Sequence, residues 1–231
     1  MNDQQVYYRE HGVKPLVLFG ATHFGEVIAQ LFRDINESQQ QWDILGFLDD
    51  DQRKWHSNHL ELPVLGGIDW LKDSAPGETH TAISIGRPPY RRQVAERLDE
   101  FDVTWATGVH PSVIAGPSTS FGDGSLVMAG CLITNSVTVG NHVIMNPGTI
   151  VGHHTRIGDF STINAGVKIA GDVELGVGTY VGIGAAISDK LKIGKGAIIG
   201  GGTMVIESVD SFVTAVGVPA KVIKQRENDF D

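Results

Sequence analysis

The sequence predicts two parts, a small α/β domain of the Rossmann-like type over residues 1–107 and a parallel β-helix over residues 108–231. Glycine is distributed unevenly, with nine in residues 1–108, nineteen in residues 109–205 and one after them. The glycine-rich part has an apolar residue at every sixth position, which is typical of solenoids. The preceding part alternates short apolar runs with helical patterns, which is typical of parallel α/β sheets. The two patterns therefore predict two different folds in one chain.

Three apolar runs in the first part are predicted to be parallel strands, namely Leu16–Phe19, Ile44–Leu48 and Thr81–Ile85. Apolar residues at helical spacing, at positions 27, 28, 31 and 32, follow the first run, and a second helix is expected near Tyr90–Asp99. Ligands of such sheets bind beyond the carboxyl ends of the strands. The loops after these three runs are therefore the candidate ligand-binding segments.

The candidate substrate-binding residues lie in those loops. Gly20–Gly25 is a weak match to the glycine-rich dinucleotide loop, because His23 stands where a third glycine is usual. An ordinary strand–helix turn is the alternative for this loop taken alone. Convergence of three loops on one edge favours a phosphate-binding site. The residues are Gly20, Thr22, His23, Asp49, Asp50, Gly86 and Arg87.

The six-residue repeat keeps one phase over residues 109–205. Seventeen positions from Val109 to Val205 are all apolar, glycine follows nine of them, and the residue two positions earlier is small or β-branched almost throughout. Three hexapeptides form a triangular coil of 18 residues with the apolar residue inside, so about five to six coils stack at about 4.8 Å. An ordinary β-sandwich would instead alternate every two residues between loops of varying length.

Composition excludes several classes of protein. The 41% of hydrophobic residues excludes a largely disordered chain, and the net charge of −9 disfavours a generic nucleic-acid binder. The single Cys131 excludes an intramolecular disulfide framework and an all-cysteine zinc site. No apolar run is long enough for a membrane span, and Met1–Glu10 lacks the apolar core of a signal peptide. A cytoplasmic protein is expected.

Several motifs together resemble a known family. Gly-Ala-Thr-His-Phe-Gly at 20–25, Phe-Leu-Asp-Asp at 47–50, the hexapeptides and Gly-Val-Pro-Ala-Lys at 217–221 are similar to the hexapeptide-repeat sugar acyltransferases that N-acetylate UDP-linked 4-amino-sugars. The sialic acid O-acetyltransferases of the same superfamily are also similar. The resemblance runs from Leu16 to about Lys224. It implies a left-handed β-helix, a homotrimer, acetyl-CoA as co-substrate and a nucleotide-linked amino-sugar held by the first domain.

The resemblance also implies site residues. The catalytic histidine matches His153, an asparagine seven residues earlier matches Asn146, and the two residues that recognise uracil match Asp49 and Asp50. Backbone contacts to acetyl-CoA match Gly171 and Gly201, and Lys221 closes the C-terminal motif. This chain departs from the family pattern twice, since His154 replaces an acidic residue and Thr162 replaces a second histidine. Each change removes a partner that would fix the tautomer of His153.

The coil period gives an independent expectation for the same corner. Adding 18 to His153 gives Gly171, and adding 18 to His154 gives Asp172. A base and an oxyanion-binding N–H would then lie about one strand spacing apart, a separation that acyl transfer could use. Adding 18 to Asn146 gives Asn164, so an asparagine ladder is an alternative to substrate contact for Asn146.

The sequence motifs that indicate the catalytic corner do not indicate a metal site or a site for the CoA phosphates. One carbonic anhydrase class holds zinc on three histidines of a similar β-helix. Here His110, His142, His153 and His154 lack spacings of one or two coils, so no metal site is predicted. Lysines cluster toward the far end of the chain, where they would meet CoA phosphates or lie solvated at the surface. They are Lys190, Lys192, Lys195, Lys221 and Lys224.

The predicted function is acetyl transfer from acetyl-CoA to the amine of a nucleotide-linked amino-sugar. His153 is the expected general base, Gly171 the oxyanion donor, and His154 a supporting residue beside Asp172. Cys131 occupies a small, core-facing repeat position, so transfer is expected to be direct, without an acyl-enzyme. Two alternatives remain open, a sugar O-acetyltransferase of the sialic acid type and a nucleotide-sugar-binding trimer without catalysis.

Overall fold

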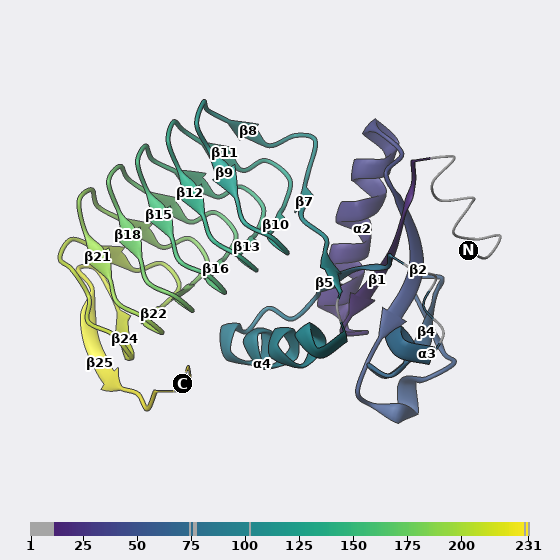
Figure 1. Cartoon of the computed structure of the whole chain (residues 1–231). Coiled ribbons are helices and arrows are strands. Elements are labelled where there is room, and N and C mark those ends of the chain that lie inside the picture. The colour runs from purple at the N-terminus through teal and green to yellow at the C-terminus, as the bar shows by residue number, and fades with distance from the viewer. Residues whose placement is uncertain (1–11, 74, 76–77, 102, 229, 231) are drawn as a thin grey trace. The chain divides into compact units, whose positions relative to one another are not determined.

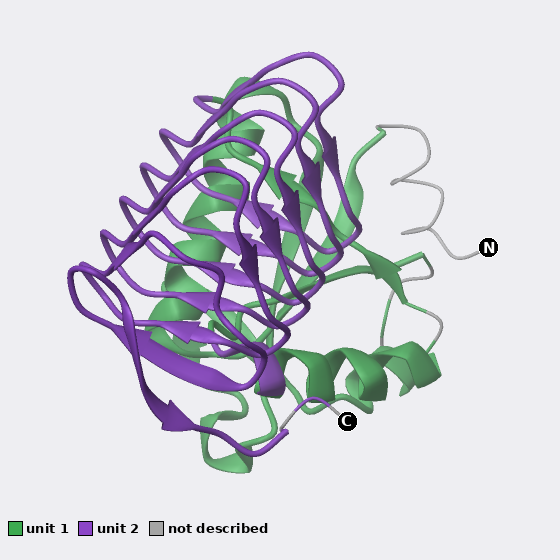
Figure 2. Cartoon of the chain, turned by 90° about the vertical axis from the view of Figure 1, so that its left-hand side faces the viewer, with its two compact units in different colours: residues 1–86, 90–111 green, residues 87–89, 112–231 purple. Residues whose placement is uncertain are grey.

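Two compact units make up the chain, residues 1–86 with 90–111 and residues 87–89 with 112–231 (Figure 2). The computed structural model describes residues 12–73, 75, 78–101, 103–228 and 230. The segment Met1–Glu10, on which the signal-peptide expectation depends, lies outside the described residues. In the part of the chain that is described, no helix has both the length and the apolar character that crossing a bilayer requires.

The first unit is built on a six-stranded sheet in the order β3-β4-β2-β1-β5-β6. The strands β1, β2, β4, β5 and β6 run parallel to their neighbours, and β3 pairs antiparallel with β4. The strands are β1 (Lys14–Phe19), β2 (Trp42–Leu48), β3 (Asn58–His59), β4 (Leu62–Gly66), β5 (His80–Ile83) and β6 (Thr104–Trp105). The helices are α2 (His23–Ser38), α3 (Trp70–Asp73) and α4 (Pro88–Leu98), with 3-10 turns at Gln52–Lys54 and Asp99–Phe101.

The predicted α/β arrangement is confirmed, with three additions. The three predicted strands and two helices are present, although β5 ends at Ile83 rather than at Ile85. Strands β3, β4 and β6 were not predicted, because they are short and β4 contains Pro63 and Gly66, which weaken a strand pattern. The core is centred on β1, whose Leu16, Val17 and Leu18 are fully buried.

Helix α2 packs closely on the sheet because of one glycine. A Cβ at Gly25 would lie 2.3 Å from the carbonyl oxygen of Gly20 and 3.0 Å from the Phe47 ring. Gly20 itself has φ +116°, a left-handed conformation that favours glycine at the end of β1. The tight turn and the close helix–strand contact are two of the glycine roles in dinucleotide-binding loops. Here Gly25 supplies the close contact, so His23 is not required to be glycine.

The second unit is a parallel β-helix of two-residue strands stacked in three sheets (Figure 1). One sheet contains β8 (Ile114–Ala115), β11 (Leu132–Ile133), β14 (Ile150–Val151), β17 (Lys168–Ile169), β20 (Ala186–Ile187) and β23 (Met204–Val205). A second contains β9 (Ser120–Phe121), β12 (Thr138–Val139), β15 (Arg156–Ile157), β18 (Glu174–Leu175) and β21 (Lys192–Ile193).

The third sheet runs to the C-terminal end of the chain. It contains β10 (Leu126–Val127), β13 (Ile144–Met145), β16 (Thr162–Ile163), β19 (Tyr180–Val181), β22 (Ile198–Ile199), β24 (Val213–Val216) and β25 (Lys221–Gln225). Strand β25 turns back and pairs antiparallel with β24. A further short strand, β7 (Gly108–Val109), belongs to the first unit.

Register follows the predicted 18-residue period through β23, and the last coil is shorter, since Ile198 pairs with Thr214 and Ile193 with Val209. Val151 of β14 pairs with Ile133 before it and Ile169 after it, a step of 18 residues each way. The repeat positions from Val127 to Val205 are buried, and those at Val109, Ala115 and Phe121 are not. The first coils of a stack have a coil on one side only, so their inward residues stay partly accessible. The predicted left-handed β-helix is confirmed.

The corners of the prism are also aligned by hydrogen bonds. The N–H of Asp172 donates to the carbonyl oxygen of His153 at 2.8 Å, and the N–H of Lys190 donates to Gly171 at 3.0 Å. His154, Asp172 and Lys190 share a left-handed φ of 58°. Each coil therefore repeats the same turn, and residues 18 apart are stacked at one corner.

Candidate active site

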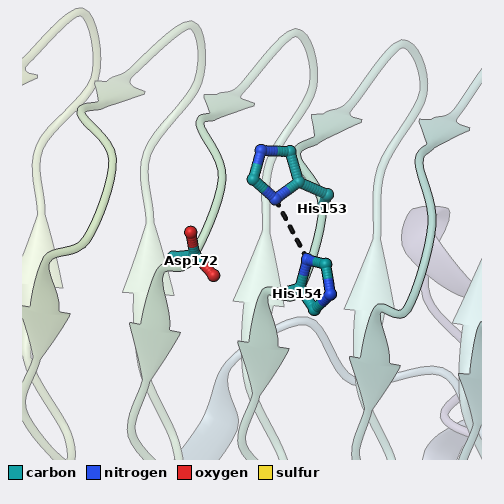
Figure 3. Close-up of side chains that lie close together, drawn as sticks. All are labelled: His153, His154 and Asp172. Carbon is teal, nitrogen blue, oxygen red and sulfur yellow. Dashed lines mark hydrogen bonds between the residues drawn. The ribbon is translucent and has the colours of Figure 1, made fainter.

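Two adjacent histidines face each other at the corner after β14. The Nδ1 atoms of His153 and His154 lie 3.1 Å apart, and the ring planes are nearly perpendicular at 80° (Figure 3). One Nδ1 carries the hydrogen and donates it to the other, because two bare nitrogens would repel. Both side chains are exposed. The pair thus fixes the ring of His153 without an acidic neighbour in sequence.

Gly171 lies directly beneath the ring of His153, one coil further on. A Cβ at this position would lie 2.5 Å from both Cε1 and Nε2 of His153. The absence of a side chain at residue 171 therefore allows Nε2 to approach the backbone. Among the described residues, the Gly171 N–H has no hydrogen-bond acceptor. The role of this N–H as an oxyanion donor stays a prediction.

Asp172 completes a cluster with the two histidines. One ligand atom from each of His153, His154 and Asp172 lies within 4.8 Å of the other two. Figure 3 shows the carboxylate on the neighbouring coil, beside the histidine pair. The coil period predicts this placement, since Asp172 is 18 residues after His154.

The other predicted catalytic and cofactor residues lie at different corners of the same chain. Asn146 lies one side of the prism before His153. The Nδ2 of Asn146 donates to the Ile163 carbonyl at 3.4 Å, and the Nδ2 of Asn164 donates to the Val181 carbonyl at 2.7 Å. Each asparagine therefore bonds to a backbone carbonyl of the following coil, and the choice between a ladder and a substrate contact for Asn146 stays a prediction. Gly201 follows Gly171 by 30 residues, one coil and two sides, so the two glycines lie at different corners.

Four of the five predicted lysines are exposed, and Lys195 is half-buried. Lys221 and Lys224 lie on β25, with exposed side chains. Lys192 pairs with Glu174 at 3.3 Å, Lys190 lies 4.0 Å from Asp189, and Lys195 lies over the Phe212 ring.

Cys131 does not take part in the site. Its side chain is 1% exposed, and its thiol donates to the carbonyl of Asn146 at 3.4 Å. Burial raises the pKa of the Cys131 thiol. A protonated, buried thiol is a poor nucleophile.

The three loops of the first unit lie side by side, because β2, β1 and β5 are neighbours in the sheet. The Ser84 hydroxyl donates to the Gly20 carbonyl at 2.8 Å and joins two of the loops. Thr22 caps α2, since its hydroxyl accepts from the Gly25 N–H at 3.2 Å. His23 and Arg87 are exposed, and Gly86 is half-buried.

Asp49 holds these loops together. Its Oδ2 accepts from the Ala21 N–H at 2.9 Å and from Lys54 Nζ at 2.8 Å, and its Oδ1 accepts from the Asp51 N–H at 2.9 Å. With 8% of its surface exposed, Asp49 is a structural anchor between the ends of β1 and β2. Lys54, which also donates to the Ala21 carbonyl, was missed by the sequence analysis because no motif contains it.

Asp50 instead points outward and pairs with Arg97 of α4. Two parallel bonds of 2.7 and 2.8 Å join the guanidinium to the carboxylate. Hydrogen bonding from Arg97 lowers the pKa of Asp50 below its usual value of 3.8. The guanidinium also lies 5.9 Å from the centre of the Phe19 ring. Arg97 is 47 residues from Asp50, so no sequence spacing indicates the pair.

Known proteins are similar to this chain in both of its units. Residues 15–98 match the model of the PglD N-terminal domain family. The structure is similar to PerB of Caulobacter crescentus in complex with CoA and GDP-perosamine, with 26% identity, a TM-score of 0.83, and coverage of 92% of this chain and 98% of that one. No curated protein sequence matches the chain.

Two further solved structures are similar over the same extent. The acetyltransferase domain of PglB from Neisseria gonorrhoeae, in complex with acetyl coenzyme A, is 26% identical with a TM-score of 0.83, covering 92% of this chain and all of that one. WeeI from Acinetobacter baumannii is 27% identical with a TM-score of 0.82, covering 91% and 100%. The resemblance found in the sequence motifs is confirmed across both units.

Proposed function

Because the chain resembles the hexapeptide-repeat sugar acyltransferases in both units, we propose that it transfers an acetyl group from acetyl-CoA to the 4-amine of a nucleotide-linked amino-sugar. At the level of reaction class, the chain is an acetyl-CoA-dependent sugar acetyltransferase. Three similar structures, those of PerB, the PglB domain and WeeI, each align with more than nine-tenths of it. The position of the amine and the role of each residue are the proposal.

The contact of His153 with Gly171 is the observation that best supports the proposed mechanism. With the Nδ1 hydrogen of His153 donated to His154, the Nε2 lone pair is free to accept a proton. As the sugar nitrogen attacks the thioester carbon, its proton passes to Nε2 and a carbon–nitrogen bond forms. The Gly171 N–H stabilises the oxyanion of the tetrahedral intermediate. Collapse breaks the carbon–sulfur bond and releases the CoA thiolate, which takes the proton from His153.

The histidine pair has a supporting role in this scheme. His154 accepts from His153 and holds the tautomer that leaves Nε2 free. Asp172, within 4.8 Å, favours the positive charge that develops on the pair during transfer. His154 and Asp172 together thus supply what a single acidic neighbour supplies in the family pattern.

A homotrimer is part of the proposal, because one chain leaves the site incomplete. Gly171 and Gly201 both match family contacts to acetyl-CoA, yet they lie at different corners of one prism. An apolar row of Ile114, Leu132 and Ile150 is exposed on the outer face of the sheet that leads to His153. Packing of this face on a second chain would bury the row and bring another corner to His153.

The nucleotide is assigned to the loops after β1, β2 and β5. Arg97 and Asp50 present a planar, charged pair there, and Lys54 adds a cation beside the Gly20–Thr22 turn. The sugar, the base and a cytoplasmic location belong to the same proposal.

The decisive experiment is an acetyl-transfer assay with a panel of acceptors. The purified protein is mixed with acetyl-CoA and with UDP-, GDP- and dTDP-linked 4-amino-sugars, and products are identified by mass spectrometry. The expected result is an acetylated amine with one of these sugars. Acetylation of a hydroxyl alone would favour the O-acetyltransferase. Nucleotide-sugar binding without any transfer would identify a binding protein.

A further inference from the structure

We propose that His153, His154 and Asp172 bind Zn²⁺, and that the bound metal switches off the catalytic histidine. The two Nδ1 atoms lie 3.1 Å apart, and a carboxylate oxygen of Asp172 lies within 4.8 Å of one ring nitrogen of each histidine (Figure 3). Metal binding stands on this geometry alone. The inhibition rests on the proposed function, in which Nε2 of His153 is the base.

The distances suit zinc. Zinc binds imidazole nitrogen at about 2.0–2.1 Å in a tetrahedral arrangement, so neighbouring ligand atoms lie about 3.3 Å apart. The two Nδ1 atoms already meet this condition. Asp172 is exposed and sits at a turn tied to His153 by the 2.8 Å backbone hydrogen bond. A rotation of its side chain brings the carboxylate to the metal without repacking the core, and water supplies the fourth ligand.

Nothing in the described part of the chain competes for the carboxylate. Lys190 follows Asp172 in the same corner column, but its ammonium lies 4.0 Å from Asp189. No described cation forms an ion pair with Asp172. Its negative charge is therefore available to a divalent ion.

The sequence spacing did not reveal this site, because the ligands are 1 and 18 residues apart and belong to two coils. A search for histidines separated by whole coils finds no triad. The cluster depends on His154, which stands where the resemblance places an acidic residue. A second imidazole at this position converts a charge partner of His153 into a zinc ligand.

Coordination changes the tautomer of His153. Zinc uses the Nδ1 lone pair, so the single proton of the neutral ring moves to Nε2. The number of protons on the histidine pair stays the same, since His153 loses one at Nδ1 and gains one at Nε2. Nε2 then has no lone pair to accept the proton of the sugar amine. Zinc thus lowers kcat and leaves the binding of acetyl-CoA and sugar unchanged.

The binding test uses the full chain freed of metal with EDTA and dialysed. Zn²⁺ is titrated into wild type, His154→Asn and Asp172→Asn by calorimetry, and Co²⁺ absorption reports the coordination geometry. The control is Asp189→Asn, which removes the same charge from an exposed carboxylate at the same edge. We expect one metal per chain, at least tenfold weaker binding in the two cluster variants, and less than a twofold change in the control. Equal affinities in all four proteins would overturn the site.

The inhibition test measures acetylated product by mass spectrometry with and without Zn²⁺, each variant against its own metal-free rate. Wild type should lose kcat with both KM values unchanged and recover with EDTA, and His154→Asn should be insensitive at the same zinc concentration. Binding without loss of kcat would overturn the switch and leave the site. Absence of transfer in metal-free wild type would instead count against the proposed function, and the binding result would stand independently.

Discussion

The imidazole of His153 covers the α-carbon of Gly171, one coil away, so closely that no side chain fits between them. Two properties of the site follow from this contact. Nε2 is held over the backbone of Gly171, whose N–H has no acceptor among the described residues. The ring cannot turn toward the next coil without a change in the Nδ1 contact to His154.

Gly171→Ala tests this contact. The new Cβ would lie 2.5 Å from Nε2 and would displace the ring. Because a misplacement of about 1 Å can cost about 10²-fold, we expect kcat to fall by about that factor. Gly130→Ala is the control, since its Cβ meets nothing closer than 3.9 Å, although its φ of +71° costs some stability. Steady-state rates and thermal unfolding separate the two effects; a Gly171→Ala enzyme at full rate would contradict the site.

His153→Ala and His154→Ala separate a base from a positioning residue. Loss of a general base lowers kcat by about 10²–10⁴-fold, which we expect for His153. Loss of His154 should cost about tenfold or less, because His153 remains. Both side chains are exposed, so neither change leaves a cavity in the core. Circular dichroism checks the fold, and a larger effect for His154 would reverse the two roles.

Asp50→Ala and Arg97→Ala test the nucleotide site. Each change breaks the paired hydrogen bonds of 2.7 and 2.8 Å, so each should raise the KM for the nucleotide-sugar with kcat nearly unchanged. Because the two residues act as a unit, the KM of the double variant should be no higher than that of the more impaired single variant. Additive losses would show that they contact the nucleotide separately. Asp51→Ala, which breaks an exposed pair with Arg53, is the control.

Cys131 should be inert in the folded protein. Its thiol is buried and its pKa is raised, so Ellman's reagent should react only after unfolding in urea. Cys131→Ser should retain most of the kcat, because no acyl-enzyme forms. Rapid native labelling that abolishes transfer would point to a covalent mechanism.

Leu132→Glu tests the trimer. Leu132 lies between Ile114 and Ile150 in the exposed apolar row, and a carboxylate buried there would lack a partner. We expect light scattering to give a single-chain mass and transfer to be lost. Thr138→Glu changes an exposed residue of another sheet and serves as the control. A single-chain mass for wild type would refute the trimer itself.

The β-helix and its corner could be predicted because one period governs both. Steps of 18 residues connect His153 with Gly171 and His154 with Asp172, and the backbone pairing makes the same steps. The first unit has no such period. Arg97 of α4 meets Asp50 across 47 residues of sequence, and Asp49 is anchored by Lys54 from a turn without a motif. Such contacts depend on tertiary structure and leave no spacing in the sequence.

The constant coil also limits how such a chain can change in length. A one-residue insertion between His153 and Gly171 would shift the residues after it out of phase with the coil before, and would separate the two residues. Insertion of a whole coil beyond Lys190 would lengthen the prism by about 4.8 Å and leave that contact intact. Changes in length that preserve the site are therefore insertions or deletions of entire coils, whereas single substitutions at the corners change the chemistry. His154, beside His153, occupies such a corner position.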